Sequence, residues 1–479
     1  MNLRRWLRPG IGVKRWVLVA FIGLVALALA GALVLRQVYR DVEVEGPLQA
    51  LLYVVTLQFL PYAARGAALA GLGLVLFAFG SFRLIKALTD PFRVGVDQPF
   101  VEVIYQKRFL ARGPRIVAIG GGTGLSTLLR GLKTHTSNLT AVVTMADDGG
   151  SSGKLREALG IPPVGDLRNC IAALADAEPL MTQLLQYRFP DDASARQEIE
   201  AVGSATTAAP SPHTERSSAA GDPGAAGTVT TAALSDRGSL AGHPVGNLLI
   251  AAMTAIEQGD FEEGVRTINR VLAVRGQVIP VTSRPLTLHA RLEDGEEIEG
   301  QARITRTAGI AQVWVSPPDV LASDDAIRAI AEADAIVVGP GSLFTSVVPA
   351  LLLPAVQRAI RESGAPCIYV ANVATQQSET LGMDLAGHVD ALSTHVGPDL
   401  IDIVLANNNV GARVPDDWHG EHVRLAWPPA GGAPRLVLED VVDPENAHHH
   451  DAARLAAAVM RIAEREAGSR RRASVARSA

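Results

Sequence analysis

Two long apolar runs separate the first 111 residues from the rest of the chain. Residues 16–35 are apolar throughout, long enough for a helix across the roughly 30 Å hydrocarbon core of a bilayer. Residues 66–82 form a shorter run, flanked by Arg65 and Arg83, whose long side chains can reach the interface. The pattern predicts a transmembrane helical hairpin and a juxtamembrane linker within residues 1–111.

Basic residues indicate how this hairpin is oriented. They precede the first run and follow the second, and fewer lie between the runs, so the positive-inside rule places both ends in the cytoplasm. A cleaved signal peptide is the alternative, but Arg36 rather than a small-residue cleavage site follows the first run. We therefore expect a membrane-anchored protein with its main domain in the cytoplasm.

From Arg115 onward, short β-branched runs alternate with apolar residues at helical spacing. This alternation is typical of βαβ units and predicts an α/β fold with a mostly parallel sheet over residues 112–467. The expected strands are 115–119, 139–145, 311–315, 335–338, 367–371 and 401–406, and the expected helices are 167–176, 244–257, 324–333, 351–363 and 451–466. Residues 191–241 are rich in Ala, Ser, Thr, Gly and Pro and predict a disordered insertion, as does the basic tail 468–479.

Composition narrows the classes of partner. Apolar residues make up 48% of the 479 positions, which is enough for a large core. Acids (49) slightly outnumber Lys and Arg (44), and the middle of the chain has no basic stripe, so no nucleic-acid partner is expected. The two cysteines, Cys170 and Cys367, lie in apolar stretches and fit reduced thiols rather than a disulfide or zinc site.

A glycine cluster follows the first expected strand and precedes a helix. Glycines allow a sharp turn and close approach to a phosphate, while the amides of a helix N-terminus face an anion. The spacing differs from the dinucleotide and P-loop patterns, which disfavours hydride transfer. The sequence predicts a phosphate or diphosphate site at Gly120, Gly121, Gly122, Thr123 and Gly124, with a plain strand–helix turn as the alternative.

The second expected strand ends in adjacent acids and small polar residues. Loops at the carboxyl edge of a parallel sheet line its ligand crevice. Asp147 and Asp148 there are candidates for holding Mg²⁺ against a diphosphate or for binding ribose hydroxyls, and a solvated acidic turn is the alternative. The candidate phosphate contacts are Gly149, Gly150, Ser151 and Ser152.

Three further segments carry polar candidates. Asp166 suits a helix N-cap, while Arg168 and Asn169 in the next turn can reach an anion. His243 begins an apolar helix and is more typical of a capping or packing residue than of a general base. The three histidines at 448–450 lack the spacing of a zinc site, and Asp451 after them is expected to cap the last helix.

A second strand, glycine turn and helix start occur at 335–346. Its candidate contacts are Gly339, Gly341, Ser342 and Thr345, so that two turns in one sheet can grip both ends of a diphosphate-linked ligand. The polar loop after the strand at 367–371 adds Asn372 and Gln376 for a base or sugar, although a connecting loop is nearly as good an interpretation.

Taken together, five ordered motifs resemble the gluconeogenesis-factor (YvcK) family. They are Ile-Val-Ala-Ile-Gly-Gly-Gly-Thr-Gly (116–124), Asp-Asp-Gly-Gly-Ser-Ser-Gly (147–153), Gly-Asp-Leu-Arg-Asn-Cys (165–170), Gly-His-Pro-Val-Gly-Asn-Leu-Leu (242–249) and Gly-Pro-Gly-Ser-Leu-Phe-Thr-Ser (339–346). The resemblance runs from about 115 to 467 and omits only the insertion. The chain departs from the family pattern at 349–355 and 374–380, which bears on sugar and base preference.

The resemblance implies a Rossmann-like doubly wound fold shared with 2-phospho-L-lactate transferase (CofD). It also implies binding of UDP-sugars such as UDP-N-acetylglucosamine, with Asn247 in the ligand site, and a role in cell shape and wall synthesis during gluconeogenic growth. A regulator without turnover is the first hypothesis, because the residues show no nucleophile–base pair. A phosphotransferase acting on a nucleotide-activated donor with Mg²⁺ is the second. The sequence leaves the protein partner open, including a homo-oligomer.

Overall fold

The computed structural model describes residues 109–189 and 240–478, except for 177, 241, 412–413, 415–417 and 428–433. It also describes a few isolated positions before 109. The predicted hairpin and the insertion lie essentially outside these residues. No single described helix has the length and apolar character needed to cross a membrane. By contacts, the chain divides into a unit at Met1–Ala111 and a unit at Arg112–Ala479.

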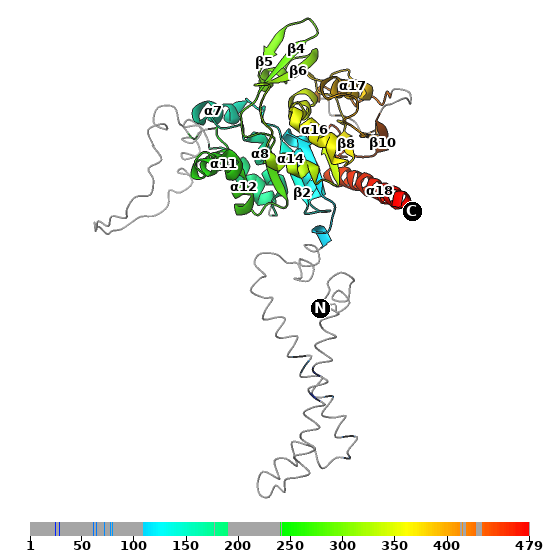
Figure 1. Ribbon diagram of the computed structural model, residues 1–479. Helices are drawn as coiled ribbons and strands as arrows, with labels where there is room; N and C mark the ends of the chain where they lie inside the picture. Colours follow the sequence, from blue (N-terminus) through cyan, green and yellow to red (C-terminus); the bar gives the residue numbers. More distant parts are fainter. Residues whose placement is uncertain are drawn as a thin grey trace, which may run out of the picture. The chain divides into compact units, whose positions relative to one another are not determined.

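The second unit is built on a fully parallel sheet of seven strands (Figure 1). The strand order is β10-β9-β8-β7-β1-β2-β3, with β1 (Ile116–Gly120), β2 (Leu139–Val143), β3 (Gln277–Pro280), β7 (Ala335–Val338), β8 (Cys367–Val370), β9 (Ile403–Asn407) and β10 (Arg435–Glu439). Every residue of β1, β7, β8 and β9 is buried. Such strands read as continuous apolar runs because helices cover both faces. The α/β, Rossmann-like prediction is confirmed.

The strand order reverses beside β1. The chain moves outward from β1 through β2 to β3, then returns to β7 on the other side of β1 and proceeds outward to β10. In open α/β sheets, ligands bind outside the carboxyl ends of the strands at such a switch point. The turns that follow β1 and β7 are the two predicted glycine turns, and they are neighbours here.

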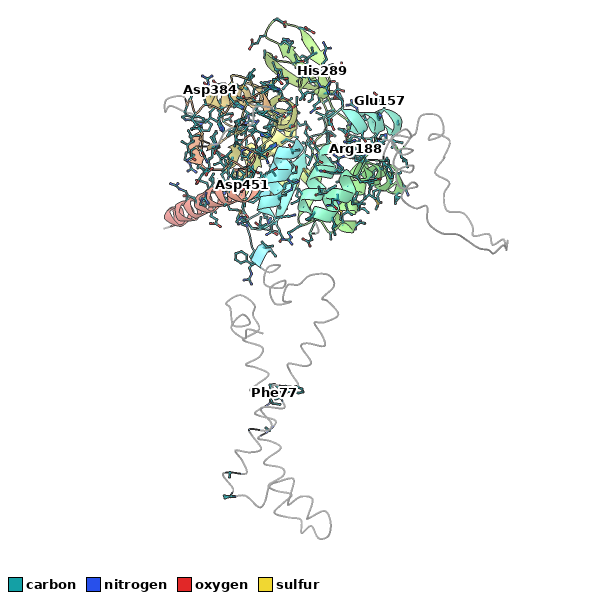
Figure 2. The ribbon with its side chains drawn as sticks, turned by 180° about the vertical axis from the view of Figure 1, so that it is seen from behind. Phe77, Glu157, Arg188, His289, Asp384 and Asp451 are labelled. Carbon is teal, nitrogen blue, oxygen red and sulfur yellow. The ribbon has the colours of Figure 1, made fainter. Side chains whose placement is uncertain are left out.

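Helices flank the sheet on both sides. Helix α6 (Gly122–Leu132) packs against α8 (Gly165–Leu174) and α18 (Ala452–Ser478), while α14 (Asp324–Ala331) packs against α16 (Pro354–Ser363). The remaining helices are α7 (Gly150–Leu159), α9 (Glu178–Gln186), α11 (Val245–Ile256), α12 (Phe261–Val271), α15 (Val348–Leu351) and α17 (Leu385–Val396), and a π-helical turn η3 spans Leu343–Val347. Figure 2, from behind, shows Asp451 at the start of α18. The Asp451 carboxylate accepts from Arg454 N–H at 2.8 Å, which confirms the predicted cap.

Two expectations need correction. The strand expected at 311–315 belongs to a separate antiparallel sheet of order β5-β4-β6, formed by β4 (Thr287–Leu292), β5 (Glu297–Glu299) and β6 (Ile310–Ser316), with the short helix α13 (Gln301–Ile304) beside it. Its partly exposed residues fit a sheet with one face on the core and one in water. The tail expected to be disordered from 468 is helical to Ser478, because the helix-forming Arg and Ala residues of this segment continue α18.

Candidate functional site

The two glycine turns pack directly against each other. A side chain at Gly124 would place its Cβ 2.6 Å from the Pro340 carbonyl oxygen, and one at Gly341 would lie 3.2 Å from the Gly121 oxygen. Gly122 begins α6 with φ +68°, a conformation that favours glycine. The cluster after β1 is therefore required by backbone contact with the other turn as well as by its own geometry.

At the second turn, the amide donors expected to be free already have a partner. Glu379 is 4% exposed, and its two carboxylate oxygens accept from the Phe344 N–H (3.1 Å) and the Thr345 hydroxyl (2.5 Å). Burial raises the pKa of Glu379, while these hydrogen bonds oppose the shift. The prediction that this helix start awaits an anion is wrong for these two groups, because a carboxylate of the protein occupies them.

The first turn also has a carboxylate beside it. Val164, not Asp166, is the N-cap of α8, so the capping interpretation of Asp166 is wrong. The Asp166 carboxylate instead packs against Gly121, and the Gly122 N–H stabilises its ionised form. Desolvation, followed by repulsion from Asp147, raises the pKa of Asp166 to about 7. The charge at this turn therefore changes near neutral pH.

The two adjacent acids after β2 accept hydrogen bonds from different elements. Asp147 accepts from the Gly149 N–H at 3.0 Å, at the start of α7, and burial raises its pKa. Asp148 turns toward the small sheet, where it accepts from the Ala302 N–H of α13 at 2.8 Å. This arrangement does not suit a shared Mg²⁺ site for the two carboxylates. The described part of the chain also has no group of three or more metal-binding side chains.

Three of the motifs meet in one chain of hydrogen bonds. Arg168 Nη1 donates to Asn247 Oδ1 (3.1 Å), and Asn247 Nδ2 donates to Ser151 Oγ (3.0 Å). Ser151 Oγ lies 2.8 Å from His243 Nδ1, and Arg168 Nη2 donates to Asn169 Oδ1 at 3.2 Å. Thus α7, α8 and α11, far apart in the sequence, contribute to a single polar cluster at the carboxyl edge of the sheet.

The loop after β8 contacts the second turn. Asn372 Nδ2 donates to the Gly341 oxygen at 2.9 Å, and Gln376 Nε2 donates to Ser342 Oγ at 2.8 Å. The Gln376 Oε1 atom is buried and has no hydrogen-bond partner among the described residues. A buried, unpaired amide oxygen beside a glycine turn is available to a donor on a ligand.

Most of the predicted candidates therefore converge, and two contributors were missed or undervalued. Glu379, in the polar loop after β8, is the only acid between Gln376 and Met383, and its contact with the second turn was not predicted. His243 was regarded as a packing residue, but it is hydrogen-bonded to Ser151. The histidines at 448–450 make ring and backbone contacts. His448 stacks on Trp418 at 4.3 Å between ring centroids, and buried His450 lies 3.2 Å from the Ala371 oxygen.

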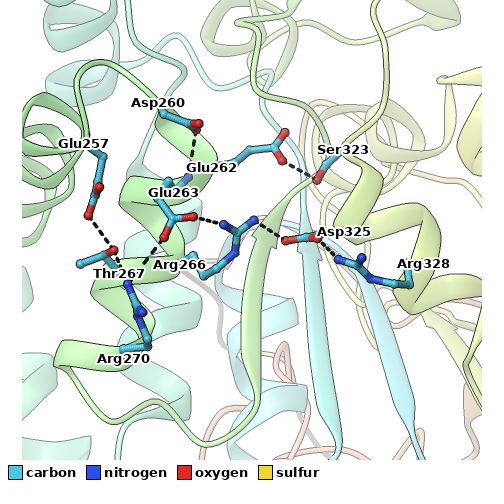
Figure 3. Close-up of polar contacts among 10 residues, drawn as sticks. All are labelled: Glu257, Asp260, Glu262, Glu263, Arg266, Thr267, Arg270, Ser323, Asp325 and Arg328. Carbon is cyan, nitrogen blue, oxygen red and sulfur yellow. Dashed lines mark hydrogen bonds and ion pairs between the residues drawn. The ribbon is translucent and has the colours of Figure 1, made fainter.

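A cavity lies at the opposite edge of the sheet. It has a volume of about 810 Å³, and its walls are the starts of β1, β2 and β3 with helices α12 and α14. Figure 3 shows that Arg266 of α12 links Glu263 on its own helix to Asp325 of α14. This cavity is bordered by ion pairs, and none of the candidate ligand-contact residues lines it, so its volume does not make it the candidate site.

Comparison with known proteins agrees with this arrangement. The family model described as 2-phospho-L-lactate transferase CofD matches residues 116–421. The chain is 39% identical over 310 residues to the gluconeogenesis factor of Bacillus subtilis, covering 64% of this chain and 82% of that protein. It is similar to the gluconeogenesis factor of Halalkalibacterium halodurans, with 40% identity over 293 residues, 61% of this chain and 77% of that protein.

A solved structure supports the same grouping. A protein of the UPF0052 family from Bacillus halodurans superposes with a TM-score of 0.58 at 35% identity, covering 73% of this chain and 99% of that one. The extent of these matches, together with the ordered motifs at one sheet edge, shows that the chain belongs to the gluconeogenesis factor family and carries a CofD-type domain.

Proposed function

We propose that this protein is a regulator that binds a UDP-sugar of the UDP-N-acetylglucosamine type and supports cell shape and wall synthesis during gluconeogenic growth. The observation that carries the proposal is the convergence of all five motifs at the β1/β7 switch point. A diphosphate there meets the first turn and the Arg168 side chain. The sugar and base reach the polar side chains around Ser342 and Gln376.

Unused hydrogen-bonding capacity supports a polar ligand. Among the described residues, Arg168 Nε, Thr144 Oγ1 and Gln376 Oε1 are buried without a partner. Buried polar groups are nearly always paired, so three such atoms around the switch point favour a ligand with both acceptors and donors. Arg168 supplies a cation for the diphosphate, and Gln376 supplies an acceptor for a hydroxyl or amide N–H.

Calorimetry tests this function on the full chain in a mild detergent, with UDP-N-acetylglucosamine as the probe. We expect saturable binding, and the variants Arg168→Gln and Gln376→Leu should each weaken it about tenfold or more, as expected for a lost hydrogen bond to a charged or buried group. Arg328→Gln, in the ion-paired cavity at the opposite edge, is the matched control and should bind like the unmodified protein. Absence of heat with every UDP-sugar rejects the proposal.

We further propose that the hairpin within residues 1–111 anchors the protein in the membrane with the main domain in the cytoplasm. The two apolar runs and the flanking basic residues support this placement. Green fluorescent protein fused after Ala479 should fluoresce, and alkaline phosphatase fused after residue 50 should be active outside the cytoplasm. The opposite pattern of the two reporters excludes this topology.

A phosphotransferase is a second candidate, because the matching family model is described by that activity. It requires transfer of a phosphoryl-linked group from a nucleotide-activated donor to an alcohol in the presence of Mg²⁺. Release of nucleotide that depends on both the donor and the alcohol would establish it. Binding without release leaves the regulator as the function.

A further inference from the structure

The hydroxyl proton of Ser151 has a defined direction. Asn247 Oδ1 accepts from Arg168, so the Asn247 amide group must present its Nδ2 to Ser151. Ser151 Oγ is therefore an acceptor toward Asn247, and its own proton is left for the third neighbour, His243 Nδ1, at 2.8 Å. An imidazole that accepts at Nδ1 is neutral and carries its proton on Nε2.

The surroundings keep His243 in that neutral form. Desolvation lowers the pKa of His243, and the positive charges of Lys154 on α7 and Arg188 after α9 lower it further. A neutral imidazole in contact with a hydroxyl is the arrangement by which proteins activate serine nucleophiles. The sequence showed no such pair because 91 positions, including the insertion, separate the two residues.

We propose that Ser151 is a nucleophile and that His243 is the base that accepts its proton, giving this site covalent chemistry toward an electrophilic phosphorus. In the step, the Ser151 Oγ–phosphorus bond forms and the proton moves to His243 Nδ1. The bond from phosphorus to its leaving group breaks, and the leaving group departs with the electron pair. For a phosphoanhydride, the leaving group is the second phosphate.

The position of Ser151 suits this step. It lies in the first turn of α7, whose N-terminus has no side-chain cap, so that backbone N–H groups can stabilise charge on the phosphoryl oxygens. Ser151 is 8% exposed and lies beside the partly exposed His243 imidazole, so a small electrophile has access at the mouth of the site. The proposal goes beyond ligand binding and does not depend on which nucleotide sugar is bound.

The chain contains a second serine–histidine pair that serves as an internal control. His289 Nε2 lies 2.8 Å from Ser316 Oγ on the small sheet, and Figure 2 labels His289 there. This pair has the same separation but lies between two strands, without a helix N-terminus or an asparagine donor. His289 also stacks on Trp314, with 5.5 Å between ring centroids. Proximity alone predicts equal reactivity of the two serines, whereas an activated nucleophile predicts that only Ser151 reacts.

The test uses a small alkyl fluorophosphonate on the full chain in detergent, with intact mass and peptide mapping as the readouts. The reagent loses fluoride as the serine–phosphorus bond forms. We expect one adduct, on Ser151, and none on Ser316. The Ser151→Ala variant should remain unlabelled. His243→Gln, which keeps a polar side chain but not the base, should slow labelling about 100-fold, the lower range for general-base catalysis.

The pH profile separates a base from a structural partner. Labelling of the unmodified protein should rise with pH as His243 loses its proton and then level off. In His243→Gln this rise should disappear, and in His289→Gln the rate and profile at Ser151 should be unchanged. No labelling of Ser151, equal labelling of Ser316, or a normal rate in His243→Gln overturns the proposal. Calorimetry with UDP-N-acetylglucosamine reports separately on the binding function, because the reagent needs no nucleotide sugar.

Discussion

The two glycine turns have the same order of strand, glycines and helix, yet they differ in what occupies them. At the turn after β7, buried Glu379 accepts hydrogen bonds from Phe344 and Thr345, so the helix start is closed by the protein itself. At the turn after β1, Asp166 lies against Gly121 and Gly122, and its pKa of about 7 lets its charge change near neutrality. The hydrogen-bond donors of the turn after β7 are paired with a carboxylate of the protein, whereas the turn after β1 lies beside a carboxyl group whose charge depends on pH.

This contrast shows that a strand–glycine–helix pattern specifies a shape rather than a ligand. The amides of a helix N-terminus favour any negative group, and a carboxylate from elsewhere in the fold serves as well as a phosphate. The turn after β7 then mainly supports the turn after β1, through the contact of Gly124 with Pro340. The predictions below test this division between a supporting turn and a ligand-facing turn.

The largest effect is expected where the turns touch. In Gly124→Val, the new Cβ lies 2.6 Å from the Pro340 oxygen and 3.0 Å from the Gly341 nitrogen, which are backbone atoms that cannot easily move. We expect a loss of about 3 kcal/mol in the free energy of unfolding, measured by urea unfolding of the full chain in detergent. Gly411→Ala is the control, since its nearest neighbour is 3.6 Å away. An unchanged stability would show that the turns do not depend on their contact.

Removing the carboxylate of the supporting turn should have the next largest effect. Glu379→Ala leaves the buried Phe344 N–H and Thr345 hydroxyl without their acceptor, which we expect to lower the free energy of unfolding by about 2 kcal/mol. Glu379→Gln keeps one acceptor oxygen and should lose about half as much. Urea unfolding measures both variants. If the Ala variant bound a phosphate-containing ligand more tightly without losing stability, the turn would be a ligand site and not a support.

A smaller effect is expected at the ligand-facing turn. Gly122→Ala puts a side chain at φ +68°, where the backbone strain costs about 1 kcal/mol. Gly160→Ala has the same φ at the end of α7, with no atom within 4 Å of the new Cβ. Both variants should lose similar stability, but only Gly122→Ala should weaken binding of UDP-N-acetylglucosamine in calorimetry. Equal affinities in the two variants would place the diphosphate elsewhere.

The sequence predicted the parallel sheet because its central strands are apolar on both faces, and their β-branched runs are readable without a structure. It also placed Arg168 and Ser151 among the candidates, because small and polar residues follow strand ends, whereas Asn247 was a candidate only through the family resemblance. Predicting their partners was harder. Glu379 is 34 residues from Thr345 along the chain, and Asp166 is 44 residues from Gly122. Local sequence patterns do not predict contacts between residues so far apart.

The same limit explains the misplaced strand at 311–315. Its composition fits either a parallel or an antiparallel sheet, and only its pairing with β4 decides between them. Strands β3 and β10 were not predicted, since each lies at an edge of the sheet and has only four or five residues, too few for a clear pattern. The π-helical turn after β7 was also beyond prediction, because the bonds that create it depend on the packed neighbour.

Asp166→Asn should show the most informative dependence of stability on pH. In the folded protein the pKa of Asp166 is about 7, whereas an aspartate in an unfolded chain has its ordinary pKa of 3.8. Between these values the folded state holds one more proton, so the stability of the unmodified protein falls as pH rises from about 4 to about 7. Asn removes this contribution. We expect the two proteins to differ little near pH 4 and the variant to be the more stable of the two at pH 8, as measured by urea unfolding at both pH values.

Binding provides the second measurement for the same variant. At pH 8 the Asp166 carboxylate is charged beside the Gly122 N–H and repels a diphosphate, so Asp166→Asn should bind UDP-N-acetylglucosamine severalfold more tightly. At pH 6, where the carboxyl is mostly protonated, the two affinities should approach each other. Calorimetry at pH 6 and pH 8 measures the affinity of both proteins for UDP-N-acetylglucosamine. If the variant bound more weakly at both, Asp166 would be a hydrogen-bonding contact of the ligand, and the first turn would be as closed to an anion as the second.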